Sequence, residues 1–155
     1  MALLFGEIET KVDAKHRLAI GLAFRELLHP EQDGRDFIMI LGPDRHLWLY
    51  PELYYRRLLR TMRRSPLPTR DSAHFNLFFG MAALVRPDAQ GRVVIPPKLL
   101  SRANTSESVT VVGNDDHLEI WPTDEWERHV EEGLKTYGEM LFQAAERMNA
   151  ESATG

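Results

Sequence analysis

The stretch VDAKHRLAI at residues 12–20 returns as PDAQGRVVI at residues 87–95, and this repeat decides the fold. Asp, Ala, Arg and Ile coincide between the two copies at an offset of 75 residues. A second pair of blocks, GPDRHLWLYP at residues 42–51 and GNDDHLEIWP at residues 113–122, shares Gly, Asp, His, Leu and Pro at an offset of 71. Two matched blocks in the same order indicate a duplication, and a four-residue difference in the intervening loop reconciles the two offsets.

Each copy predicts the same series of elements around its repeated turn. Asp opens the turn because its side chain accepts hydrogen bonds from backbone N–H groups two residues on. A strand, a short helical turn and a hairpin then follow in each copy, and we expect them at residues 17–20 and 92–95, 22–28 and 97–102, and 37–50 and 108–121. Strands dominate each copy and helices decorate it, so the expected fold class is α+β with a β-barrel core.

Apolar residues at helical spacing predict further helices after each copy. The stripes consist of Tyr55, Leu58, Leu59 and Met62, and of Trp126, Val130, Leu134, Tyr137 and Leu141. Thr123 is the expected N-cap of the second helix, and another helix over about residues 70–79 should end at Gly80. The predicted organisation is a first module at residues 5–52, linking helices at 53–80, a second module at 81–124 and a C-terminal amphipathic helix at 125–150.

The composition is that of a soluble globular protein, with 43% hydrophobic and 27% charged residues in a chain of 155. The absence of cysteine excludes a disulfide framework, a thiolate metal site and a thiol nucleophile. The first residues lack the features of a signal peptide, and no apolar run approaches the ~20 residues that span a bilayer. We therefore expect a cytoplasmic protein.

The net charge of −4 is distributed unevenly along the chain. Residues 1–80 carry 12 Lys and Arg against 10 Asp and Glu, whereas residues 81–155 carry 7 against 13. A basic face that binds nucleic acid is compatible with this distribution, although the overall balance is acidic.

The repeated turns and their flanking blocks resemble the MraZ family of bacterial transcriptional regulators, which have tandem SpoVT-AbrB-like domains. The resemblance covers about residues 4–135. It is carried by the Asp-x-x-x-Arg turns at 13–17 and 88–92, by FGE at 5–7, by LWLYP at 47–51 and by RVVIP at 92–96.

The resemblance implies a swapped-hairpin AbrB-like barrel in which one chain supplies both halves, and a ring-shaped homo-oligomer. It also implies a nucleoid-associated regulator that binds direct repeats in double-stranded DNA near its own promoter and controls the division and cell-wall gene cluster. It implies no catalytic residues, no cofactor, no membrane association and no small-molecule ligand.

The family's DNA-contacting positions correspond to Lys15 and Arg17 in the first turn and to Arg92 in the second. Gln90 stands where Lys15 stands, so the first turn should contribute more charge to a DNA interface. His16 replaces the glycine that is usual in the first turn, and it offers a hydrogen-bond donor near phosphate.

The backbone at His16 is expected to have a positive φ, which His tolerates better than most side chains. The second turn keeps the usual glycine as Gly91, and Gly21-Leu22 replaces the proline-led pair that usually follows the first strand. The first turn should survive these changes, with its register and target sequence open to change.

The turn arginines have two interpretations that the sequence leaves open. Arg17 and Arg92 contact phosphates and base edges, or each forms an i,i+4 pair with Asp13 or Asp88 that merely stabilises its turn. Both hold if each Asp orients its Arg towards DNA.

The densest basic stretch lies in the linking region and consists of Arg56, Arg57, Arg60, Arg63, Arg64 and Arg70. A DNA-facing helix is one interpretation, and we favour a solvated face or an inter-subunit surface. The acidic helix after Thr123 is then the natural partner across a subunit interface.

Enzymatic and metal-binding functions find no support in the sequence. His46 and His117 match between the copies but lack neighbours at zinc-site spacing, and Trp48, Trp121 and Trp126 are expected in a core or interface. No phosphate loop or nucleophile elbow occurs, and an Arg four residues after Asp13 and Asp88 would oppose a shared-proton dyad. The competing class is an AbrB-like module that binds a protein partner.

Overall fold

The structure, a computed structural model, describes residues 2–62, 66–70 and 72–154. The first half of the chain contains β1 (Glu7–Lys11), β2 (Arg17–Ala19), α1 (Leu22–Glu26), α2 (Pro30–Asp33), β3 (Phe37–Leu41) and β4 (Leu47–Pro51). The second half repeats the pattern with β5 (Ala83–Val85), β6 (Arg92–Val94), α5 (Pro97–Arg102), β7 (Ser108–Asn114) and β8 (His117–Pro122). The predicted α+β class is therefore confirmed.

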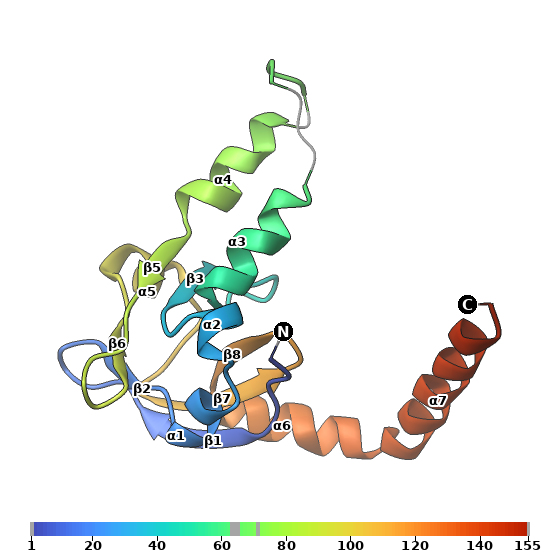
Figure 1. The fold of residues 1–155 in the computed structure, drawn as a ribbon. Coiled ribbons are helices and arrows are strands. Elements are labelled where there is room, and N and C mark those ends of the chain that lie inside the picture. The colour runs from blue at the N-terminus through green and yellow to red at the C-terminus, as the bar shows by residue number, and fades with distance from the viewer. Residues whose placement is uncertain (1, 63–65, 71, 155) are drawn as a thin grey trace. The chain divides into compact units, whose positions relative to one another are not determined.

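The strands of the two halves are exchanged in two antiparallel sheets (Figure 1). The larger sheet has the order β1-β7-β8-β4-β3-β5, so β1 from the first half pairs with β7 from the second, and β5 pairs with β3. The smaller sheet joins β2 to β6, with Arg17 opposite Val94 and Ala19 opposite Arg92. In the part of the chain that the structure describes, the larger sheet ends at β1 and β5, and the strands do not form a closed barrel.

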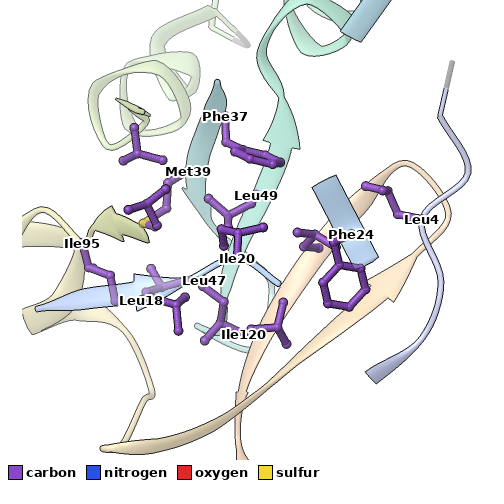
Figure 2. Packing of buried hydrophobic residues seen from close by; sticks show 14 of the residues in the cluster. Leu4, Leu18, Ile20, Phe24, Phe37, Met39, Leu47, Leu49, Ile95 and Ile120 are labelled. Atoms are coloured by element: carbon purple, nitrogen blue, oxygen red, sulfur yellow. The ribbon is translucent and has the colours of Figure 1, made fainter. Parts of the chain in front are cut away.

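One core serves both halves, and its buried side chains come from strands and helices of each (Figure 2). Leu18 and Val93 of the small sheet are fully buried, and they belong to one cluster with buried side chains from both halves. The labelled core residues in Figure 2 are Leu4, Leu18, Ile20, Phe24, Phe37, Met39, Leu47, Leu49, Ile95 and Ile120. Removal of one such large side chain costs about 2–5 kcal/mol, so the small sheet is held firmly against the core.

Two helices form an arm between the halves, α3 (Glu52–Arg60) and α4 (Phe75–Gly80), the latter preceded by a 3₁₀ turn, η1 (Ser72–His74). The helix expected over residues 70–79 is thus a 3₁₀ turn followed by a shorter α-helix. Tyr55 of α3 is buried, and its ring centroid lies 6.5 Å from that of Phe78 in α4. Of the predicted basic stretch, Arg63 and Arg64 lie outside the described residues.

The chain separates into two compact units, residues 1–123 and residues 124–155. The second unit contains most of α6 (Thr123–Leu134) and all of α7 (Tyr137–Thr154), where the sequence predicted one helix. Thr123 is the first residue of α6, and its hydroxyl lies 3.1 Å from that of Thr110. Among the described residues, no helix is both long and apolar enough to cross a membrane.

Candidate nucleic-acid interface

The first repeated turn is organised around the carboxylate of Asp13. Its Oδ1 accepts hydrogen bonds from the backbone N–H groups of Lys15 at 2.9 Å and Arg17 at 2.8 Å. Its Oδ2 accepts from Nε of the Arg17 side chain at 2.6 Å. The backbone closes the turn from His16 N–H to the Asp13 carbonyl at 2.9 Å. One carboxylate therefore fixes both the backbone of the turn and the arginine that follows it.

The second turn repeats this geometry bond for bond. Asp88 Oδ1 accepts from the backbone N–H groups of Gln90 at 2.9 Å and Arg92 at 3.0 Å. Asp88 Oδ2 accepts from Arg92 Nε at 3.0 Å, and Gly91 N–H donates to the Asp88 carbonyl at 2.9 Å. The Asp that opens each turn is thus a structural requirement of the turn, and each Arg is its partner.

Hydrogen bonding also lowers the pKa of both carboxylates. The backbone N–H of Arg17 is the main cause of the lowered pKa of Asp13, and it outweighs the opposing effect of burial. The backbone N–H of Arg92 lowers the pKa of Asp88 in the same way. Each Asp therefore remains a charged acceptor at neutral pH, which holds Nε of its Arg and leaves the guanidinium in a fixed orientation.

The register of the small sheet brings the two arginines to one face. Arg17 and Ala19 alternate with buried Leu18 in β2, and Arg92 alternates with buried Val93 in β6. Because Ala19 lies opposite Arg92, the outer face of this two-strand ribbon carries both guanidinium groups. The side chains of Arg17 and Arg92 are 30% and 31% exposed.

Backbone hydrogen bonds tie each turn to the other copy. Ile20 N–H donates to the carbonyl of Gly91 at 2.8 Å, and Ile95 N–H donates to the carbonyl of His16 at 2.9 Å. In Figure 1 the loops that lead into β2 and β6 lie at the same end of the first unit. The structure thus brings together the predicted residues of both copies: Asp13, Lys15, His16, Arg17, Asp88, Gly91 and Arg92.

The corresponding residues His16 and Gly91 both have positive φ, 61° and 78°. His16 is exposed, whereas Gly91 is buried. A Cβ placed on Gly91 would lie 2.6 Å from Cζ of Arg25 and 2.7 Å from its Nε. The second turn therefore favours glycine for its backbone conformation, and a side chain at this position would also displace the Arg25 guanidinium. Sequence reasoning missed Arg25, because neither its spacing nor the repeat singles it out.

The matched histidines lie away from the turns, among aromatic side chains of the large sheet. The ring of His46 lies 4.2 Å from that of Trp121, and His117 stacks on Trp48 at 4.0 Å. Trp126 lies elsewhere, in α6. Within the described residues, no group of three or more His, Cys, Asp or Glu side chains has an arrangement that could hold a metal ion.

A hydrogen-bonded chain connects His117 to the arm. Tyr54 of α3 donates to Asp116 at 2.6 Å, Asp116 contacts Nδ1 of His117 at 2.7 Å, and Nε2 contacts Glu119 at 2.8 Å. Burial opposes the charged imidazole, but hydrogen bonds to Glu119 and Asp116 raise the pKa of His117. Burial likewise opposes ionisation of Glu119, and its hydrogen bonds with His117, Asn114 and Trp121 lower its pKa to about 2.

Two arginines of the arm have local partners. Arg56 forms an ion pair with Glu52 at 3.0 Å, and Arg57 donates to the backbone carbonyl of Gln32. These contacts fit a stabilising role within the first unit as well as an exposed basic surface.

Comparison with known proteins finds relatives over most of the chain. The family model described as "MraZ protein, putative antitoxin-like" matches residues 78–150. A Clostridium tetani protein named Transcriptional regulator MraZ is 34% identical over 128 residues, which cover 82% of this chain and 87% of that protein. Proteins of the same name from Lactiplantibacillus plantarum and Bifidobacterium longum are 33% and 31% identical over 139 residues, covering 89% of this chain and 95% and 89% of theirs.

Proposed function

The chain belongs to the MraZ family, and on that premise we propose that it is a transcriptional regulator that binds double-stranded DNA through its two repeated turns. The observation that carries the proposal is the shared outer face of the β2–β6 ribbon. There Arg17 and Arg92 are held by identical Asp-centred turns and present guanidinium groups of nearly equal exposure.

The residues of each turn have distinct roles in this proposal. Arg17 and Arg92 bind phosphates or the O6 and N7 atoms of guanine, a contact that contributes about 1–3 kcal/mol of discrimination. Lys15 and His16 bind phosphate at the first turn, because phosphate contacts position a protein on the duplex. Asp13 and Asp88 do not touch DNA and instead orient the arginines.

Several copies of this face are needed, because the chain carries a net charge of −4. A ring of identical subunits repeats the face in one orientation, so it should bind direct repeats in preference to palindromes. Effective concentration within such a ring multiplies weak single contacts by roughly 10² or more. Affinity then depends on the number of repeats that the DNA offers.

The proposed subunit contact joins the basic arm of one copy to the acidic C-terminal helices of another. Six arginines and two acidic residues lie between residues 52 and 80, whereas residues 124–154 carry eight acidic residues and three basic ones. Opposite charge favours association and fixes register. An oligomer mass that stays unchanged as salt rises would exclude this contact as the one that holds the ring.

The family resemblance supports two further parts of the proposal. The target is the division and cell-wall gene cluster, near the protein's own promoter, on the nucleoid. The exchange of β1 and β5 between the halves supports a duplicated swapped-hairpin origin, with modules at residues 5–52 and 81–124 joined by the arm and followed by C-terminal helices.

Fluorescence anisotropy tests the proposal with a duplex from the region upstream of the protein's own gene. We expect selective binding over a scrambled duplex, an affinity that falls linearly with log[salt], and loss of selectivity in the Arg17→Ala/Arg92→Ala variant. Deletion of repeats one at a time should lower affinity steeply.

Equal binding to one repeat and to three would exclude the multivalent mechanism. If the protein shows no selective binding even at low salt, the DNA proposal fails and a protein partner becomes the better hypothesis. A variant that loses binding must keep the melting temperature of the original protein, so that unfolding is not mistaken for a lost contact.

A further inference from the structure

We propose that Arg25 is an additional DNA-binding residue, which supplies to a backbone phosphate at the second turn the positive charge that Gln90 lacks. The inference rests on the proposed function and extends it to a residue outside both repeated turns.

Arg25 belongs to α1 in the first half of the chain, yet its guanidinium lies against the turn of the second half. Nε donates to the carbonyl of Ile20 at 3.0 Å, and Ile20 N–H donates to the carbonyl of Gly91 at 2.8 Å. The close approach to Gly91 places the guanidinium beside the turn that carries Arg92. The terminal nitrogens of Arg25 hold its remaining N–H donors, which suit a phosphate oxygen.

The position of Arg25 is charged in the first copy and apolar in the second, as the proposal requires. The offset of 75 residues places Leu100 in the second copy where Arg25 stands in the first, and Leu100 is partly buried against the core. Lys15 has the uncharged counterpart Gln90. The first turn therefore has Lys15 and Arg17, and the second turn has Arg25 and Arg92, so each turn presents two strong cations.

The acidic residues near Arg25 do not cancel its charge. A pocket of about 490 Å³ behind the second turn is lined by Arg25 and Arg35 and by Glu26, Asp36 and Asp88. Asp36 forms an ion pair with Arg86 at 3.3 Å, and Asp88 forms one with Arg92 at 3.0 Å.

Together these groups comprise four arginines and three carboxylates, a surplus of one positive charge. Removal of Arg25 would leave the local charge balanced. Arg25 is the arginine of this group whose guanidinium approaches the backbone of Gly91, so it brings positive charge to this edge of the turn.

The test compares Arg25→Gln and Arg25→Lys with the original full-length protein, on the upstream duplex and on a scrambled duplex, over a salt series. We expect Arg25→Gln to lower affinity 3- to 10-fold, roughly the effect of one lost phosphate contact, and to reduce the salt slope by about 0.9 for each Arg25 that contacts phosphate. Arg25→Lys keeps the charge and should retain the slope, although it loses the Nε bond to Ile20.

A matched control is Arg102→Gln, which removes one exposed charge from α5, the corresponding helix of the second copy. Its salt slope should stay close to that of the original protein. The inference is overturned if Arg25→Gln binds with unchanged affinity and an unchanged salt slope. It is also overturned if the salt slope of Arg25→Lys or of Arg102→Gln falls as much as that of Arg25→Gln.

These outcomes are separable from failure of the proposed function. Selective binding by the original protein with no change in Arg25→Gln overturns the role of Arg25 alone. Absence of selective binding by the original protein overturns both. Thermal unfolding of each variant distinguishes a lost phosphate contact from a displaced turn.

Discussion

The two repeated turns have the same hydrogen bonds but different surroundings. Asp13 and Asp88 each hold two backbone N–H groups and one arginine Nε, and the positive-φ position is His16 in one turn and Gly91 in the other. The first turn projects an exposed histidine, whereas the second is closed by Arg25 from the other copy. The two turns thus share the Asp-x-x-x-Arg framework and differ in the charged groups around it.

The largest effect on stability should come from an alanine substitution at the positive-φ position of each turn. We expect Gly91→Ala to lower the free energy of unfolding by about 2–3 kcal/mol, because left-handed backbone costs about 1–2 kcal/mol and displacement of Arg25 breaks its bond to Ile20. The matched variant His16→Ala should change it by less than about 1 kcal/mol, because position 16 already carries a Cβ in that conformation. Chemical denaturation measures both free energies of unfolding. Equal losses of stability in the two variants would contradict the proposed difference between the turns.

The matched histidines also differ in their surroundings. His117 forms hydrogen bonds with Asp116 and Glu119, whereas the corresponding positions near His46 are Arg45 and Trp48. We expect His117→Gln to lower the free energy of unfolding by about 1–3 kcal/mol at pH 6, since it breaks a largely buried network.

The pH dependence of this difference has a definite sign. Because the folded pKa of His117 is raised, its charged form stabilises the protein fully below the unfolded pKa of 6.5, and this contribution disappears as pH rises through the folded pKa. The gap between the two proteins should therefore narrow above pH 6.5. Denaturation curves at several pH values measure it, and a gap that widens with pH would contradict the assignment.

Substitutions at Lys15 and Gln90, which occupy corresponding positions in the two turns, should alter the salt dependence of DNA binding. Lys15→Gln should reduce the salt slope by about 0.9 per lost phosphate contact, and Gln90→Lys should increase it by a similar amount. Anisotropy over a salt series measures both slopes. If neither substitution alters the salt slope, positions 15 and 90 do not contact phosphate.

The smallest expected effect is on stability when the turn arginines are removed. Arg17→Ala and Arg92→Ala should each change the free energy of unfolding by no more than about 1 kcal/mol, because partly exposed ion pairs contribute little. A loss above about 2 kcal/mol would mean that the arginines serve the fold more than DNA binding.

Much of this architecture could be predicted from local sequence. The Asp at the start of each turn acts within four residues, so its motif predicts both the turn and the arginine partner. Alternation of apolar residues predicts strands in the same way, because the strand period is short. The helical stripe across Leu134 and Tyr137 did not reveal that α6 ends and α7 begins between them, since both helices keep the spacing.

Long-range contacts were the part that the sequence did not reveal. The pairing of β1 with β7 depends on which edges meet in the folded sheet. Arg25 lies against Gly91, 66 positions away, and matching the two copies compares Arg25 with Leu100 and never with Gly91. The link from the arm to this network was missed for a similar reason, because Tyr54 of α3 donates to Asp116, which in turn contacts His117.

The most direct test of the central claim is photo-cross-linking from single cysteines, which the absence of native cysteine makes unambiguous. Ala14→Cys and Ala89→Cys place a thiol at the exposed tip of each turn, and Thr61→Cys places one on the arm. After labelling with an azidophenacyl group, both turn variants should cross-link to the upstream duplex and less to a scrambled one, while the arm variant should not. Cross-linking from Thr61→Cys without cross-linking from the turns would contradict the account.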